Sequence, residues 1–264
     1  MYSTFDDYNT FSTFLNKEHY SNIYVDESIL VPLQKVQTTF LNLIIYNPGS
    51  DYEIRMKDVL VPYLEKQDNV LFYFLVNRDQ TEDVMIEDNI MYIKGVEKAV
   101  PGILDKTIKA MEWCQKRIQY SYLIRSNIST IINFSKLDSS IFKENYSGCE
   151  ALNLQWIDEP YGVVDMSLWG TLYIRGIGIF LSAEAVACLI DHKDELEWSI
   201  IDDLSIGILL KKYNYTFNKT VGTVHNNTTP NSVCYRNRSD FGGRNKDVER
   251  MKKIINMIDG SIKY

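Results

Sequence analysis

Short apolar runs alternate with amphipathic stretches through the first half of the chain, and no other feature limits the fold as strongly. Three runs rich in β-branched and aromatic residues predict strands: LNLIIYN (41–47), NVLFYFLVN (69–77) and NIMYIKG (89–95). The second run is almost continuously apolar, as strands buried on both faces of a parallel sheet are. Helix-like stretches over 51–66 and 101–117 follow the first and third runs. The alternation predicts an α/β fold with a mostly parallel sheet flanked by helices.

A fourth apolar run, YLIRSN (122–127), ends abruptly in polar residues. A helix-like apolar pattern begins directly after it and continues to Leu137, which predicts a helix at this end of the strand. The carboxyl ends of strands are where α/β sheets bind ligands, and a helix N-terminus offers free N–H groups and a positive dipole end. We therefore expect an anion-binding site here, with phosphate as the favoured ligand.

The second half of the chain is less regular. A section rich in Trp and Gly (156–182) precedes predicted helices near 183–191, 202–213 and 245–258. Residues 1–38 lack steady periodicity and are interpreted as an N-terminal extension packed on the domain.

One domain over 39–264 is the preferred organisation, because no internal repeat or low-complexity tract interrupts it. A division into two domains near residue 145 is the alternative.

The overall charge and the cysteines indicate which partners and which cellular compartment the protein can have. Lys and Arg number 28 against 35 Asp and Glu, and the net charge of −7 argues against a general nucleic-acid or anionic membrane surface. No run approaches about 18 consecutive apolar residues, so no membrane span is expected. The acidic, aromatic N-terminus is unlike a signal peptide, and we expect a cytoplasmic location.

The cysteines form no C-x-x-C pair and are interpreted as buried free thiols of a reducing compartment: Cys114, Cys149, Cys188 and Cys234.

Four segments occur in an order that resembles a known family. They are NIMYIKGVEKAVPGILDKTIKAMEWC (89–114), YLIRSNISTIIN (122–133), TLYIRGIGIFLSAEAVACLI (171–190) and WSIIDDLSIGILLKKYNY (198–215). Together they resemble the β-1,3-glycosyltransferase (galactosyltransferase-like) family over roughly residues 40–215. The resemblance implies the GT-A nucleotide-sugar fold, with a nucleotide-binding half over about 39–145 and an acceptor-binding, catalytic half over about 146–264.

The chain departs from this family at the metal-binding motif. Where the family has an Asp-Asp-Asp triplet that holds a divalent cation, this chain has Asn127, Ile128 and Ser129. Asn and Ser carry no charge and are poor sole ligands for a hard dication. We therefore expect no required metal cofactor, although Mn²⁺ or Mg²⁺ stays possible.

A basic loop before the last helix offers a replacement for the cation. Arg236, Arg238 and Arg244 lie in HNNTTPNSVCYRNRSDFGGRNK (225–246), and each offers a planar fork of donors suited to phosphate. Arg236 and Arg238 point the same way if the segment is extended. An ordinary solvated basic loop is the alternative.

Two adjacent carboxylates are the candidate catalytic groups. The resemblance places Asp203 at the family's general base for an inverting, single-displacement transfer, with Asp202 as a neighbour that orients the acceptor. An Asp pair that only favours a helix N-terminus through its dipole is the alternative.

Further residues are candidates for binding the donor, each with a structural role as its alternative. Gly176 and Gly178 allow close backbone approach, and aromatic faces at Trp156, Trp169 and Trp198 suit stacking on an acceptor sugar. The remaining candidate nucleotide contacts are Asn47, Ser50, Lys106, Arg125, Ser126, Asn127, Ser129 and His225.

The resulting hypothesis is a cytoplasmic glycosyltransferase of bacterial or viral origin, acting in the host cytoplasm if viral. Its expected partners are a UDP-sugar donor and a glycan or glycoprotein acceptor, with no nucleic acid. A degenerate GT-A domain that binds nucleotide or glycan without turnover is one alternative, and a nucleotidyltransferase is another. Neither a G-x-x-x-x-G-K-[ST] nor a G-x-G-x-x-G phosphate loop occurs, which argues against the commonest kinases, NTPases and dehydrogenases.

Overall fold

The computed structural model describes residues 35–48, 51–137, 141, 145–155, 166–217, 220–239 and 243–260. The chain divides into two units, Met1–Val36 and Gln37–Tyr264. Residues 1–34, most of the first unit and of the extension predicted over 1–38, lie outside the described residues, and residues 36–38 of that predicted extension belong to the first strand of the sheet.

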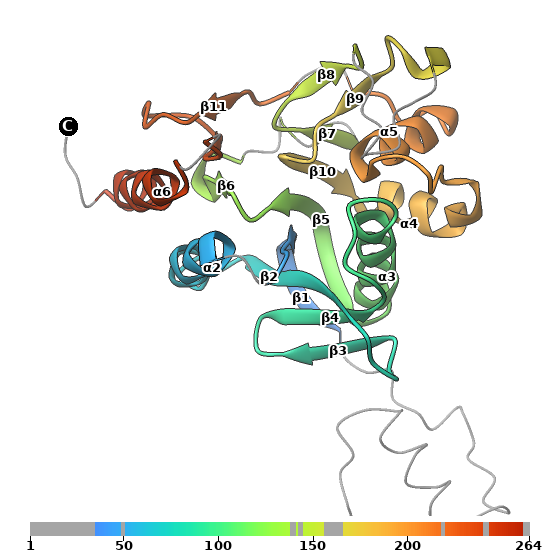
Figure 1. Ribbon diagram of the computed structural model, residues 1–264, viewed down its shortest axis with the longest axis horizontal. Helices are drawn as coiled ribbons and strands as arrows, with labels where there is room; N and C mark the ends of the chain where they lie inside the picture. The colour runs from blue at the N-terminus through green and yellow to red at the C-terminus, as the bar shows by residue number, and fades with distance from the viewer. Residues whose placement is uncertain are drawn as a thin grey trace, which may run out of the picture. The chain divides into compact units, whose positions relative to one another are not determined.

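A seven-stranded sheet forms the centre of the second unit, in the order β3-β4-β2-β1-β5-β10-β7 (Figure 1). β1 pairs with β2, and β2 with β4, in parallel, whereas β3, β10 and β7 join their neighbours antiparallel. The sheet therefore has a parallel centre with antiparallel edges. Its strands are β1 (Val36–Ile45), β2 (Val70–Arg78), β3 (Val84–Glu87), β4 (Ile90–Lys94), β5 (Ile118–Asn127), β7 (Tyr146–Gly148) and β10 (Gly178–Ser182).

Helices cover both faces of the sheet, and each face has its own core. β1 shows the reason: Phe40 and Ile44 belong to one core cluster, whereas Leu41 and Leu43 belong to the other, because alternate side chains point to opposite faces. α2 (Asp51–Leu64) and α6 (Arg244–Ile258) pack on the first face. The opposite face is covered by α3 (Gly102–Arg117), α4 (Ala183–Asp191) and α5 (Asp202–Lys212), as Figure 1 shows.

Two smaller sheets complete the described fold. One has the order β11-β12-β6, from β11 (Thr223–His225), β12 (Cys234–Arg236) and β6 (Thr130–Ile132). The other pairs β8 (Ala151–Asn153) with β9 (Leu172–Ile174). The first of these brings the C-terminal third of the chain against the segment that follows β5, since β12 pairs with β6.

The predicted α/β class, the four strands and the helices over 51–66, 101–117, 183–191, 202–213 and 245–258 are confirmed. The helix predicted after Ser126 is wrong: β6 and a 3-10 turn at Phe134–Lys136 occupy that segment. Its Thr-Ile-Ile core is β-branched, and such residues favour extended backbone when a partner strand is present. That partner is β12, which lies a hundred residues further along the chain.

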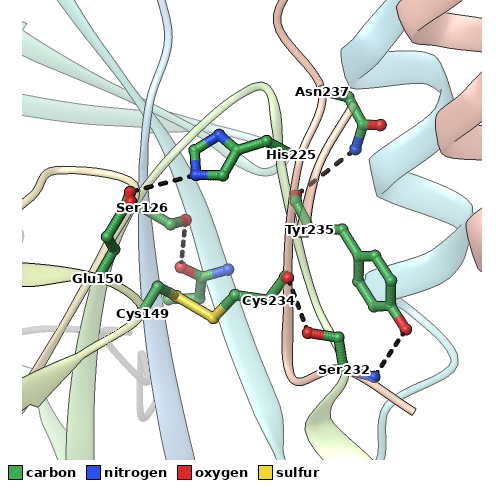
Figure 2. Close-up of a disulfide and its surroundings, with 9 residues drawn as sticks. Ser126, Cys149, Glu150, His225, Ser232, Cys234, Tyr235 and Asn237 are labelled. Atoms are coloured by element: carbon green, nitrogen blue, oxygen red, sulfur yellow. Dashed lines mark hydrogen bonds and ion pairs between the residues drawn. A yellow bond between two sulfur atoms is a disulfide. The ribbon is translucent and has the colours of Figure 1, made fainter. Parts of the chain in front are cut away.

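Two of the four cysteines form a disulfide, so the prediction of four free thiols is wrong for this pair (Figure 2). Cys149 follows β7 at the edge of the main sheet, and Cys234 opens β12, with 5.9 Å between their Cα atoms. Cys114 and Cys188 are free and buried. Because stable disulfides are rare in reducing compartments, the thiols no longer support the predicted cytoplasmic location.

Every helix within the described ranges is too short or too polar to span a lipid bilayer.

We expect the double substitution Cys149→Ala and Cys234→Ala to lower the free energy of unfolding by about 2–4 kcal/mol, since the disulfide closes a long loop. Their separation of 85 residues makes that loop long. Urea denaturation followed by circular dichroism measures the change, and Cys188→Ala is the control that removes only a free thiol. Equal unfolding midpoints for the double variant and the unreduced wild type would contradict a stabilising disulfide.

Candidate active site

A cavity of about 370 Å³ lies beside the ends of β1 and β5. It brings together six residues that the sequence singled out from three distant segments: Asn47, Asn127, Ser129, Arg236, Arg238 and Arg244. Tyr52, Glu53, Glu97 and Lys98 line the rest of its polar wall. Ser50, predicted beside Asn47, lies outside the described residues.

The small sheet and its hydrogen bonds place two of the arginines. Arg236 ends β12 opposite Thr130 of β6. The next residue, Asn237, donates its backbone N–H to the Ser129 carbonyl over 2.9 Å. Arg238 follows, and its backbone N–H donates to Oδ1 of Asn226 over 2.9 Å. The backbone of this segment is therefore fixed against the wall that carries Ser129.

Arg244 reaches the cavity from the first residue of α6. Its guanidinium carbon lies 4.5 Å from the centre of the Tyr52 ring, a cation–π contact. The Tyr52 hydroxyl in turn donates to the Asn237 carbonyl over 3.2 Å. Tyr52 thus connects α2 to the arginine-bearing segment.

The arginines carry positive charge that their surroundings do not balance. Within the described part of the chain, Nη1 of Arg236 and Nη1 of Arg244 are buried without a hydrogen-bond partner. Burial, followed by the charge of Arg238, lowers the pKa of Arg236 to about 10, so it stays protonated at neutral pH. A buried charged donor without a partner is costly, and a bound anion would offset that cost.

Acidic residues reduce this positive charge only in part. Four positive and two negative side chains line the cavity. One of the negative ones, Glu97, accepts the Asn77 backbone N–H over 2.8 Å and pairs with Lys106 at 2.5 Å. The Glu97 charge is therefore matched by Lys106, and the wall keeps an excess of positive charge.

Lys106 itself is placed behind the cavity and not in its lining. Its side chain is fully buried and donates to the Tyr46 carbonyl over 3.0 Å. Burial lowers the pKa of Lys106, and the Glu97 carboxylate opposes that shift. In this position Lys106 supports Glu97 from behind.

The Asp pair opens α5, next to the turn between β9 and β10. Asp202 pairs with Arg125 at 2.5 Å, and both side chains are buried. Asp203 Oδ2 accepts the Gly176 backbone N–H over 2.7 Å. The pKa of the Asp203 carboxyl is raised to about 6, mainly by burial. The neighbouring Asp202 charge also raises this pKa, and the Arg125 charge lowers it by a smaller amount. A carboxyl with a raised pKa near neutrality suits a general base.

Arg125 connects the Asp pair to the cavity. Its Nη1 donates to Oδ1 of Asn127 over 3.0 Å and to the Gly176 carbonyl. Asn127 lines the cavity, whereas Arg125, Asp202 and Asp203 do not. The Asp pair and the cavity are therefore connected through the hydrogen bonds and the ion pair of Arg125.

Four other predicted contacts, Ser126, His225, Trp169 and Trp198, are not part of the cavity lining. Ser126 donates to Asn42 over 2.8 Å inside the sheet. His225 lies 3.3 Å from a Glu150 oxygen on the exposed side of β11 (Figure 2). Trp198 donates its indole N–H to the Lys193 carbonyl, Trp169 is exposed, and Trp156 lies outside the described residues.

Sequence reasoning missed four polar residues of the cavity wall. Glu97 and Lys98 lie just after the predicted strand 89–95, and this position at a strand end was an available signal. Tyr52 and Glu53 had none, because Tyr and Glu are ordinary in the first turn of an amphipathic helix.

The cation that the family resemblance implies does not fit the residues present. Asn127 and Ser129 stand at its ligand positions, and the Asn127 side-chain oxygen already accepts a hydrogen bond from Arg125. No group of three or more His, Cys, Asp or Glu suited to a metal occurs among the residues that the structure describes. The donors around the cavity are instead cationic.

Comparisons with known proteins do not assign a function to this chain. No protein-family model and no curated protein sequence matches this chain. One solved structure that it resembles is "a glycosyltransferase involved in the glycosylation of the major capsid of PBCV-1". The two are 11% identical, the likeness covers 81% of this chain and 98% of that one, and the TM-score is 0.44. A likeness at this level does not assign an activity.

We expect Arg236→Gln to weaken the binding of inorganic pyrophosphate at least about tenfold, since a hydrogen bond to a charged group contributes roughly 1.5–3 kcal/mol. Isothermal titration calorimetry in buffer with EDTA measures the affinity without interference from cations. Lys252→Gln removes the same charge from the surface of α6, where Lys252 pairs with Glu249, and should leave the affinity unchanged. Equal affinities for wild type and both variants would rule out this anion site.

Proposed function

We propose that this protein is a glycosyltransferase that works without a divalent cation. It moves a hexose or N-acetylhexosamine from a nucleoside diphosphate sugar to a hydroxyl of a glycan acceptor, with inversion. The observation that supports the proposal most is one buried guanidinium nitrogen on each of Arg236 and Arg244, in one cavity, with no hydrogen-bond partner among the described residues. The family resemblance favours UDP as the nucleotide.

The charge of the cavity suits a diphosphate. Arg forks bind phosphate oxygens in pairs, and two guanidinium groups match the charge that one Mg²⁺ or Mn²⁺ would supply. In the reaction they would stabilise the negative charge that develops on the departing diphosphate. This is the part of the chemistry that a metal performs in cation-dependent transferases.

Asp203 is the proposed general base. The acceptor oxygen forms a bond to the anomeric carbon while the bond from that carbon to the diphosphate breaks. The acceptor proton passes to the Asp203 carboxylate, and the diphosphate leaves with the bonding electrons. The position of Asp203 beside Gly176, and through Arg125 beside Asn127, supports a base adjacent to the bound donor.

A binding module without turnover is the second candidate function. The neutral side chains of Asn127 and Ser129, at the family's carboxylate positions, favour it. Such a module would bind UDP in the same cavity yet leave UDP-sugars intact. The raised pKa of Asp203 favours the enzyme.

Asp203→Asn should reduce transfer roughly 10²–10⁴-fold while UDP still binds, because the amide cannot accept the acceptor proton. A panel of UDP-sugars and acceptors, with EDTA present, gives the rates. Asp194→Asn, which removes an exposed carboxylate before α5, is the matched control. Full activity of Asp203→Asn would exclude it as the base. A wild type that binds UDP without turnover on any donor would identify the module.

The rate should also depend on pH through Asp203. A base must be deprotonated, and burial raises the pKa of Asp203 to about 6. We therefore expect kcat/KM to fall as the pH drops through about 6 and to be level just above it. A profile that stays flat well below pH 6 would contradict the assignment.

A further inference from the structure

The Arg125 side chain is nearly fully buried and contacts three separate segments. It is 2% exposed, and it pairs with Asp202 at the start of α5. The same guanidinium donates to the Gly176 carbonyl in the turn between β9 and β10, and to Asn127 at the end of its own strand. A point-charge cation such as Lys could not hold three acceptors in these fixed directions.

Gly176 is held from both sides by this arrangement. Its carbonyl accepts from Arg125, while its N–H donates to Asp203 Oδ2 over 2.7 Å. A Cβ at this position would collide with the Arg125 guanidinium. The position of the Gly176 N–H, and through it one oxygen of Asp203, therefore depends on where Arg125 lies.

We propose that Arg125 is a positioning residue: it aligns the Asp203 carboxylate with the cavity wall at Asn127 by holding Gly176 and Asp202 in place. This inference rests on the proposed function and deepens it. Arg125 touches neither the donor cavity nor the acceptor proton, and it acts through Gly176, Asp202 and Asn127.

The charges around Asp203 allow an experiment to distinguish a positioning role of Arg125 from a purely structural role. The titratable groups that interact with the Asp pair are Arg125 on β5, Lys106 on α3, Tyr146 on β7 and Tyr173 on β9. The Asp202 charge raises the pKa of Asp203 and the Arg125 charge lowers it. Removing one charge or the other should move the Asp203 titration in opposite directions, which a merely structural residue would not do.

Four variants test the proposal. Asp202→Asn should move the acid limb of kcat/KM to lower pH, and Arg125→Gln should move it to higher pH, each by roughly one unit. The double variant removes one positive and one negative charge, so the net charge around Asp203 is unchanged and the limb should return towards that of the wild type. Arg125→Lys keeps the charge but loses the fork, so kcat should fall on the order of 100-fold with the limb unmoved.

A second measurement keeps the test independent of turnover. ¹³C NMR of the Asp203 carboxyl, assigned with Asp203→Asn, follows its titration in the same variants. Opposite shifts for Asp202→Asn and Arg125→Gln support the role of Arg125 even if no sugar is transferred, in which case only the proposed function fails. If the Asp203 titration is the same in Arg125→Gln as in wild type, or if Arg125→Lys keeps full kcat, Arg125 does not position the base. Should Arg125→Gln alone not fold, the double variant and Arg125→Lys still decide.

Discussion

The unbalanced positive charge of Arg236 and Arg244 is the constraint around which the described site is organised. A guanidinium nitrogen that is buried without an acceptor among the described residues carries a free-energy cost, which a bound anion would offset. Several contacts of the small sheet hold the segment in this position. The Asn237 N–H binds the Ser129 carbonyl, Asn226 holds the backbone of Arg238, and Tyr52 stacks on Arg244. Because these contacts come from distant parts of the chain, the cavity exists only in the folded protein.

The cavity and the carboxylates are parts of one arrangement. β5 brings Arg125 and Asn127 to the same end of the sheet, so one strand contributes both to the cavity wall and to the Asp202 ion pair. The disulfide between Cys149 and Cys234 ties the edge of the main sheet to β12, two residues before Arg236. The covalent link thus limits how far the arginine-bearing strand can move from the sheet that carries Asp203's partners.

Local patterns predicted the helices and the central strands, because burial on two faces requires continuous apolar runs, as in β2. They failed where partners are distant in sequence. The segment after Ser126 forms β6 because β12 pairs with it, and the local sequence does not indicate a partner strand a hundred residues away. The disulfide was not predicted because its two cysteines are also far apart in the sequence. The arginines of the cavity were predictable from their charge in a polar, Gly-containing loop, whereas the burial of Lys106 behind Glu97 depends on tertiary packing.

The most direct test is a crystal structure of the protein with UDP bound, grown with Mn²⁺ present. We expect the guanidinium groups of Arg236 and Arg244 to lie within hydrogen-bond distance of the diphosphate oxygens, with no ion between the phosphates and Asn127. A Mn²⁺ ion held at Asn127 and Ser129, or arginines that stay away from a bound diphosphate, would contradict the replacement of the metal by arginine.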